Sequence, residues 1–266
     1  MSDLHRLYGR IVCCAAALVL AGCATIPPDA GKNPRDPLER VNREVFSFND
    51  HLDRYFLKPL AQGYVAVVPQ LVRTCINNGF ANMGEIRNAI NDILQIKPKG
   101  VATDTGRLLI NSTVGILGCL EVASRVGLER RHEDFGLTLA RWGVGTGPYV
   151  VLPVLGPSDV RDAVGLVPDS YANPISYIKP IPARYGVYGG YLIDTRAELL
   201  DATNLIDQTA LDRYQFTRDA YFQRRTSQQY EGNPPLAPEE DEAAPPGPGP
   251  DATKPKPVQP PPDNRR

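Results

Sequence analysis

The sequence predicts a mostly α-helical domain. Apolar residues recur along much of the chain at intervals of three and four, the spacing that places them on one side of a helix. Leu38, Val41, Val45 and Phe48 are an example. No segment shows the strict apolar–polar alternation of half-buried strands, and there is no internal repeat. The body, residues 36–228, has the length of one domain.

The first helix is expected to begin at Asp36-Pro37-Leu38-Glu39. Asp36 suits the N-cap, Pro37 the first helical position, and Glu39 the third residue of a capping box. Pro59 is expected to end or restart this helix.

Further helical segments follow, separated by proline and glycine. Pro69 breaks the second one, and the apolar stripe that follows it ends near residue 82. The expected helical segments are 60–68, 71–82, 85–96, 103–117, 119–126 and 183–228, with a loop at 97–100.

The stretch from residue 142 to 157 is apolar but too rich in glycine and proline for a regular helix. It predicts an apolar hairpin that Gly143, Gly145 and Gly147 make mobile, with Trp142 and Tyr149 as interface anchors. A rigid turn over the core is the alternative. The glycines lack the GxGxxG spacing of a nucleotide-binding loop, so nucleotide binding is rejected.

Asp159, Arg161 and Asp162 place two acids and a base within one helical turn. They are candidates for the polar lining of a pocket or channel, against the alternative of a helix cap with a local salt bridge. Ser158 is the expected N-cap of this helix. The charged run 131–134 is expected to be an exposed loop.

Composition and motifs exclude several functions. The net charge of −1 provides no basic field for nucleic acid. His51 and His132 lie in no metal-ligand spacing, and no nucleophile, base and orienting group can be assembled. The sequence therefore predicts no metal, no cofactor and no enzyme.

The N-terminus resembles the leader of a bacterial lipoprotein. Arg6 and Arg10 precede a short apolar run that ends in Leu-Ala-Gly-Cys23. Residues 1–22 are the predicted signal peptide, Cys23 the lipidated residue, and 23–35 a tether. An ordinary signal peptide that happens to contain cysteine is the alternative. Acyl chains on Cys23 would form a stable anchor, since two or more chains hold firmly.

The C-terminal residues 229–266 hold nearly half of the 26 prolines and almost no large apolar residue, which predicts a disordered tail. Within the body, Cys75 and Cys119 form an even pair in an oxidising compartment. A disulfide between them and two buried free thiols are both compatible with the sequence.

Several of the predicted helices are amphipathic with narrow polar faces. Such helices either pack into a bundle or lie in a membrane interface. The helix pattern alone favours the bundle.

Ten segments, in the same order across residues 36–228, resemble the MlaA/VacJ family of outer-membrane lipoproteins. The resemblance is most specific over Trp142-Gly-Val-Gly-Thr-Gly-Pro-Tyr149. The other segments are Asp36 to Arg43, Phe46 to Asn49, Lys58-Pro59, Asn111 to Gly118, Asp134 to Leu139, Leu152-Pro153, Leu155 to Ser158, Arg161 to Gly165 and Thr195 to Ala197.

The resemblance implies a ring of amphipathic helices embedded in one leaflet, the periplasmic leaflet of the outer membrane. Its central channel would remove phospholipid from the outer leaflet and pass it to a soluble periplasmic carrier, similar to MlaC, for retrograde transport. Trimeric outer-membrane porins are the implied partners. The apolar helix faces would then point outward to lipid, which reverses the preference for a bundle.

By position, the resemblance places 142–156 at a hairpin beside the channel and Asp159, Arg161 and Asp162 near the lipid headgroup. Phe46, Phe48 and Asn49 would lie in an N-terminal helix that reaches lipid. Cys75, Cys119 and the proline-rich tail have no counterpart in the family pattern. A scaffolding lipoprotein that binds porins or envelope partners without moving lipid is the alternative function.

Overall fold

The computed structural model describes residues 26–234, so Cys23, the leader and most of the proline-rich tail lie outside the described residues. The described chain is mostly helical, as the sequence predicts. The elements are α2 (Glu39–Leu52), the π-helical turn η1 (Asp53–Leu57), α3 (Lys58–Val67), α4 (Gln70–Leu94), α5 (Pro98–Thr113), η2 (Ala123–Val126), α6 (Phe135–Arg141), β1 (Tyr149–Leu152), β2 (Gly156–Asp159), α7 (Val160–Ala172), η3 (Pro174–Tyr177), α8 (Ile181–Glu198), α9 (Leu200–Thr209) and α10 (Arg213–Gln229).

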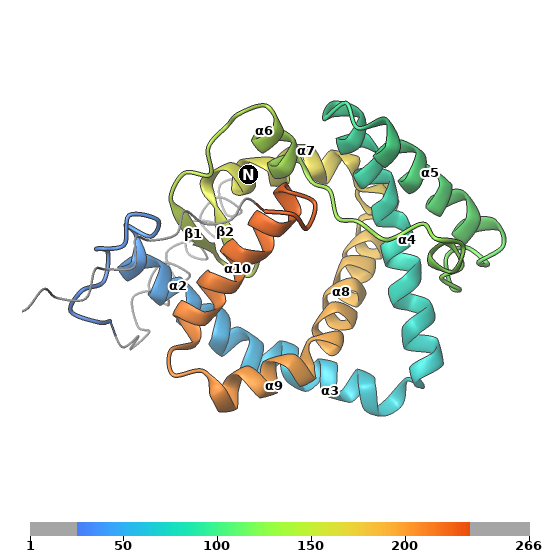
Figure 1. The fold of residues 1–266 in the computed structure, drawn as a ribbon. Helices are drawn as coiled ribbons and strands as arrows, with labels where there is room; N and C mark the ends of the chain where they lie inside the picture. Colours follow the sequence, from blue (N-terminus) through green and yellow to red (C-terminus); the bar gives the residue numbers. More distant parts are fainter. Residues whose placement is uncertain (1–25, 235–266) are drawn as a thin grey trace, which may run out of the picture.

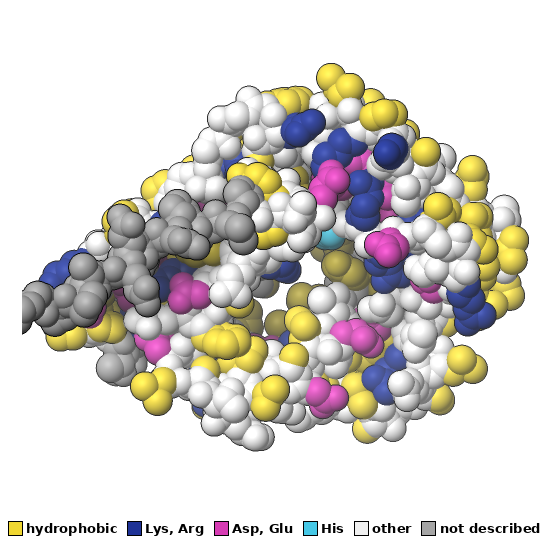
Figure 2. Space-filling view, viewed as in Figure 1, with side chains coloured by type: hydrophobic (Ala, Val, Ile, Leu, Met, Phe, Trp, Pro, Cys, Tyr) yellow, Lys and Arg dark blue, Asp and Glu magenta, His cyan; other side chains and the backbone are white. Residues whose placement is uncertain are grey.

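The helices are arranged as a ring (Figure 1). α2, α3, α4, α8, α9 and α10 surround a central opening, α5 packs outside α4, and the β1–β2 hairpin lies beside α2 and α10. The space-filling view is hollowed at the same place, so side chains do not fill the opening (Figure 2). This is the ring that the family resemblance implies.

Ion pairs close the ring between its N-terminal and C-terminal helices. Arg196 of α8 donates two hydrogen bonds to Asp53 of η1, at 2.5 and 2.8 Å. Arg213 of α10 contacts Asp50 of α2 at 2.6 Å. Charge-assisted pairs of this kind are stronger than neutral hydrogen bonds and fix geometry, so they hold helices that are far apart in sequence.

The α2–α3 region is one nearly continuous helical rod, because η1 joins the two helices without a break. Pro59 is accepted in the first turn of α3, where a missing N–H costs nothing. Val68 is extended and Pro69 precedes α4, so the predicted break at Pro69 is confirmed.

Three predicted boundaries are wrong. The two segments expected at 71–82 and 85–96 are one helix of 25 residues, α4, because nothing between them breaks the backbone. The loop expected at 97–100 is the start of α5, with Pro98 in its first turn. Of the helix expected at 119–126, only the short η2 forms.

The predicted start of α2 is also wrong. The helix begins at Glu39, and Asp36 makes no cap hydrogen bond to its backbone. Asp36 is instead fully buried and accepts hydrogen bonds from Asn42 at 2.9 Å and from the Tyr214 hydroxyl at 2.6 Å. A carboxylate from the N-terminal segment therefore fixes α10, which a local sequence pattern cannot reveal.

Cys75 and Cys119 form a disulfide that ties α4 to the loop after α5. Of the two alternatives left open by the sequence, the structure has the bridge.

The distribution of side chains is inverted relative to a water-soluble bundle. Among the described residues, 22 polar or charged residues are buried, against 10 hydrophobic ones, and 38 large hydrophobic residues are exposed. Soluble proteins seldom bury charged residues, and only when these are paired. The apolar core is one cluster between the hairpin and α10, formed by Val45, Tyr149, Val151, Tyr214 and Tyr221.

Candidate functional site: the hairpin and the polar network beside the opening

The hairpin is attached to α2 by two asparagine side chains. The amide of Asn42 donates to the carbonyl of Tyr149 at 3.0 Å and accepts from the N–H of Val151 at 2.9 Å. Two helical turns later, Asn49 makes the same pair of bonds at the tip, to Leu152 at 2.9 Å and from Val154 at 2.8 Å. The amides satisfy backbone groups at the edge of β1 that have no strand partner.

The strands occupy only the end of the predicted hairpin. β1 and β2 pair antiparallel, with Tyr149 opposite Asp159 and Leu152 opposite Gly156. Residues 143–148 form a loop between α6 and β1. The structure confirms a hairpin, but the glycine-rich part precedes its strands.

Trp142 and Tyr149 have different environments, so the prediction that both are interface anchors is half wrong. Trp142 is 55% exposed, and its indole N–H donates to the carbonyl of Leu94 at 3.1 Å. Tyr149 is fully buried, with its ring centroid 5.5 Å from that of Phe222, and burial raises the pKa of its hydroxyl. Tyr149 is a core residue.

The three glycines are not equivalent. Gly143 has φ +90° and Gly147 has φ +69°, a region that glycine enters without strain. Gly145 has no positive φ, and a Cβ there would meet no atom within 4 Å. The loop conformation therefore requires glycine at 143 and 147 only.

The Asp159–Asp162 group forms a helix cap and salt bridges. Asp159 accepts the N–H of Asp162 at 2.8 Å and so caps α7, the role expected of Ser158. Arg161 pairs with Asp162 at 3.1 Å. Asp159 and Arg161 are buried, so they cannot line a channel in this structure. Burial raises the pKa of Asp159, against the lowering effect of its hydrogen bond from Asp162.

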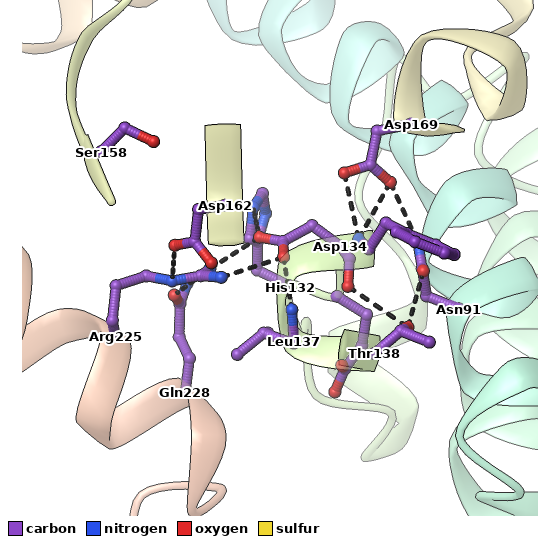
Figure 3. A network of polar contacts seen from close by, with 12 residues as sticks. Asn91, His132, Asp134, Leu137, Thr138, Ser158, Asp162, Asp169, Arg225 and Gln228 are labelled. Carbon is purple, nitrogen blue, oxygen red and sulfur yellow. Dashed lines mark hydrogen bonds and ion pairs between the residues drawn. The ribbon is translucent and has the colours of Figure 1, made fainter. Parts of the chain in front are cut away.

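Asp162 belongs to a larger polar network that joins α10 to α6, α7 and α4 (Figure 3). It accepts a hydrogen bond from the Tyr221 hydroxyl at 2.5 Å and forms an ion pair with Arg225, whose Nε lies 2.6 Å from its Oδ2. Arg225 also donates twice to Asp134, at 2.7 and 3.0 Å. These bonds lower the pKa of Asp134 in spite of its burial, and the pKa of Arg225 is raised.

The prediction of an exposed loop at 131–134 is wrong for this reason. Asp134 caps α6 by accepting the N–H of Leu137 at 2.9 Å, and Glu133 is buried. On α7, Asp169 accepts from the N–H of Phe135 at 3.0 Å and from Asn91 of α4 at 3.1 Å. A cap signal at Asp134 is visible in the sequence, but the partners of this segment, which lie 34 to 91 residues away along the chain, are not.

Phe46 and Phe48 do not both reach the surface. Phe46 packs edge-on against Tyr214 with centroids 5.7 Å apart, at the margin of the aromatic core. Phe48 is half-buried. Phe46 and Asn49 therefore both lie on a side of α2 that packs against the rest of the protein, Phe46 against α10 and Asn49 against the hairpin.

Between residues 26 and 234, no helix combines the length and hydropathy needed to span a bilayer. In the same range, no three His, Cys, Asp or Glu side chains gather in an arrangement that could hold a metal ion.

The chain is similar to known proteins over most of its length. The family model described as MlaA lipoprotein matches residues 34–228. The intermembrane phospholipid transport system lipoprotein MlaA of Escherichia coli (strain K12) is 35% identical over 210 residues, which cover 77% of this chain and 82% of the relative. An uncharacterized protein of Rickettsia bellii (strain RML369-C) is 36% identical over 200 residues, 74% of this chain and 78% of the relative.

A solved structure reported as "Structural basis for maintenance of bacterial outer membrane lipid asymmetry" matches with a TM-score of 0.63 and 35% identity. The match covers 74% of this chain and 99% of the other.

Fold and site together define a class: mostly helical ring proteins that bury many polar side chains and expose many apolar ones. Within this class, the chain belongs to the MlaA lipoprotein family. It is therefore a lipoprotein of the type that serves intermembrane phospholipid transport in the cell envelope.

Proposed function

We propose that this protein forms a channel through which mislocalised phospholipid leaves the outer leaflet of the outer membrane and reaches a soluble periplasmic carrier. In this proposal it is anchored by acyl chains on Cys23 and lies in the periplasmic leaflet beside a trimeric porin. Transport is retrograde and restores lipid asymmetry, and energy comes from elsewhere in the system.

The inverted distribution of side chains around an opening supports this proposal most directly. A helical ring whose outer surface carries exposed Leu, Ile and Val suits a hydrocarbon environment, because each apolar side chain left in water costs about 1.5–3 kcal/mol. The ring has no described helix that spans a bilayer, which suits a protein confined to one leaflet. The opening offers lipid a route past the buried polar network.

Deletion of the gene tests the proposal. We expect phospholipid to accumulate in the outer leaflet and wild-type protein to restore asymmetry, whereas Cys23→Ala, without its lipid, restores it poorly. A scaffolding lipoprotein predicts unchanged outer-leaflet phospholipid together with weakened porin association. That outcome would replace the channel proposal with the scaffold.

The loop at 143–148 is proposed to move during transport, since glycine at its ends tolerates unusual backbone angles. Gly143→Ala should slow lipid removal and destabilise the loop by about 1–2 kcal/mol, because φ +90° is strained for alanine. Gly145→Ala, in open space, is the matched control. Equal asymmetry in both variants would argue for a rigid turn.

A further inference from the structure

Three cationic or basic side chains lie between α4 and α10, at the edge of the polar network. Arg87 is on α4, His132 on the segment before α6, and Arg224 on α10. Figure 3 places His132 between α10 and α4, and Figure 2 shows charged side chains gathered at that margin of the opening. The neighbouring Arg225, by contrast, is held by Asp134 and Asp162.

Arg87 is only partly neutralised. No carboxylate among residues 26–234 lies within ion-pair distance of its guanidinium, and its buried Nε has no hydrogen-bond partner there. Its Nη2 lies 3.5 Å from Nδ1 of His132. The carboxylate of Asp169 is near enough for the charge of Arg87 to lower its pKa, but its hydrogen bonds come from the N–H of Phe135 and from Asn91.

His132 is partly exposed and has charged groups around it. Its side chain is 54% exposed. Partial loss of bulk water is the largest cause lowering its pKa, to about 4. Arg87 lowers the pKa next, Asp134 raises it from 3.8 Å, and Arg224 and Arg225 lower it further. The imidazole is therefore neutral at pH 7 and stands in a positive field.

Arg224 completes the group from the opposite side. It is exposed on α10, and no ion-pair partner approaches it within the described residues. Its charge is near enough to act on the pKa of His132. Two guanidinium groups close to one imidazole suit a phosphate oxyanion, because an arginine can donate two parallel hydrogen bonds to phosphate.

A small cavity of mixed polarity adjoins the same arginine. Arg87 lines a cavity of about 90 Å³ together with Phe80, Met83, Ile175 and Tyr191, among others. A cation beside a recess that is lined in part by aromatic and aliphatic side chains is compatible with a molecule that carries phosphate at one end and hydrocarbon at the other.

We propose that Arg87, His132 and Arg224 bind the phosphate of a phospholipid headgroup as the lipid passes the opening. The inference rests on the proposed transport function and adds the residues that hold the headgroup. It differs from the sequence-based assignment, which placed this role on Asp159, Arg161 and Asp162.

Bound phosphate would stabilise the imidazolium form, so occupancy should raise the pKa of His132 by about one unit or more. His51 is the internal control, because it is exposed, contacts Ser47 and stacks on Tyr55 on the far part of α2. The test follows both imidazoles by NMR titration of the full-length protein in detergent. The probes are dihexanoyl phosphatidylglycerol, dihexanoylglycerol and inorganic phosphate.

We expect phosphatidylglycerol to raise the pKa of His132 and leave His51 unchanged, and dihexanoylglycerol to do neither. Arg87→Gln and Arg224→Gln should each weaken phosphatidylglycerol binding about tenfold, as expected for a lost charge-assisted hydrogen bond. Arg125→Gln, an exposed arginine on η2, should not. A response to inorganic phosphate alone would indicate a free-phosphate site and overturn the headgroup assignment.

An unmoved His132 in wild-type protein that still transfers lipid would overturn this inference while the transport function stands. Loss of transfer by wild-type protein would contradict the transport function itself.

Discussion

At the scale of single residues, two buried carboxylates on adjacent helices form an unusual pair. Asp92 of α4 and Asp104 of α5 are both fully buried, and both contact Nη2 of Arg131. Each keeps a buried Oδ1 with no donor among the described residues. One arginine for two carboxylates leaves an excess negative charge, which a shared proton would remove.

The pair predicts a pH-dependent stability. Burial raises the pKa of Asp104 to about 7, opposed by Arg131 and assisted by the neighbouring Asp92. Since the unfolded carboxyl has a pKa near 4, the stabilisation is complete below about pH 4 and is lost as the pH rises toward 7. Thermal unfolding of the detergent-solubilised protein should show this loss between pH 4 and 7.

Asp104→Asn should flatten this part of the pH profile, because an amide stays neutral and can donate to Asp92. Glu129→Gln, at an exposed position, is the control and should leave the profile unchanged. A wild-type profile between pH 4 and 7 that is the same as that of Asp104→Asn would contradict the shared proton.

The sequence predicts the role of a residue well where that role depends on neighbouring residues. It predicts the role poorly where it depends on residues far away along the chain. Trp142, expected as an interface anchor, is exposed, and Gly143 has the positive φ that its glycine allows. Asp36 is mistaken for a helix cap because its partner Tyr214 is 178 residues away. Asp159 is assigned to a channel because its burial depends on packing that no local pattern records.

At the scale of elements, the hairpin depends on side chains of α2 rather than on a third strand. Asn49 alone supplies both bonds at the tip of the hairpin. Helix periodicity predicts that α2 exists, but not that its polar residues complete a sheet edge. Tertiary packing also explains why α4 is one helix although the sequence predicts two segments. The apolar spacing is weak near residue 82, but α4 packs against α5 and α8 and continues without a break.

Asn49→Ala should loosen the tip of the hairpin. Loss of two hydrogen bonds leaves a backbone N–H and a C=O without partners, a cost of about 1–3 kcal/mol for each buried group. Amide hydrogen exchange at Val154 should therefore accelerate, while exchange at Val151, held by Asn42, should change little. Equal acceleration at both amides would indicate that the hairpin opens as one unit.

The disulfide between Cys75 and Cys119 also links two parts of the fold, and its contribution to stability can be measured separately. It closes a loop of 44 residues, so its loss should cost about 2–4 kcal/mol. Cys75→Ser with Cys119→Ser should unfold at lower temperature than wild type, and the denatured, unreduced wild-type protein should show no titrating thiol from this pair. Two titrating thiols would disprove the bridge.

At the scale of the whole molecule, the ring inverts the usual arrangement of side chains. Family resemblance, carried by the Trp142–Tyr149 stretch, predicts the ring and its outward apolar faces. Amphipathicity alone favours a bundle, because period and composition do not say which side a helix buries. The structure shows which side of the helices is buried. Buried asparagines and ion pairs join neighbouring helices, and large aliphatic residues remain exposed.

The same inversion predicts where lipid contacts the molecule. Exposed apolar side chains such as Leu71, Leu117 and Leu205 lie on α4, on the loop after α5 and on α9, distributed around the ring. This distribution suits a leaflet that surrounds the protein, whereas a single docking patch would concentrate them.

Phospholipid transfer in a defined system tests the central claim most directly. Lipidated protein in vesicles that contain fluorescent phospholipid is mixed with purified periplasmic carrier, and the lipid recovered on the carrier is measured over time. The account predicts transfer well above that of protein-free vesicles, in proportion to the inserted protein. Full insertion of folded protein with transfer equal to the protein-free rate would contradict it.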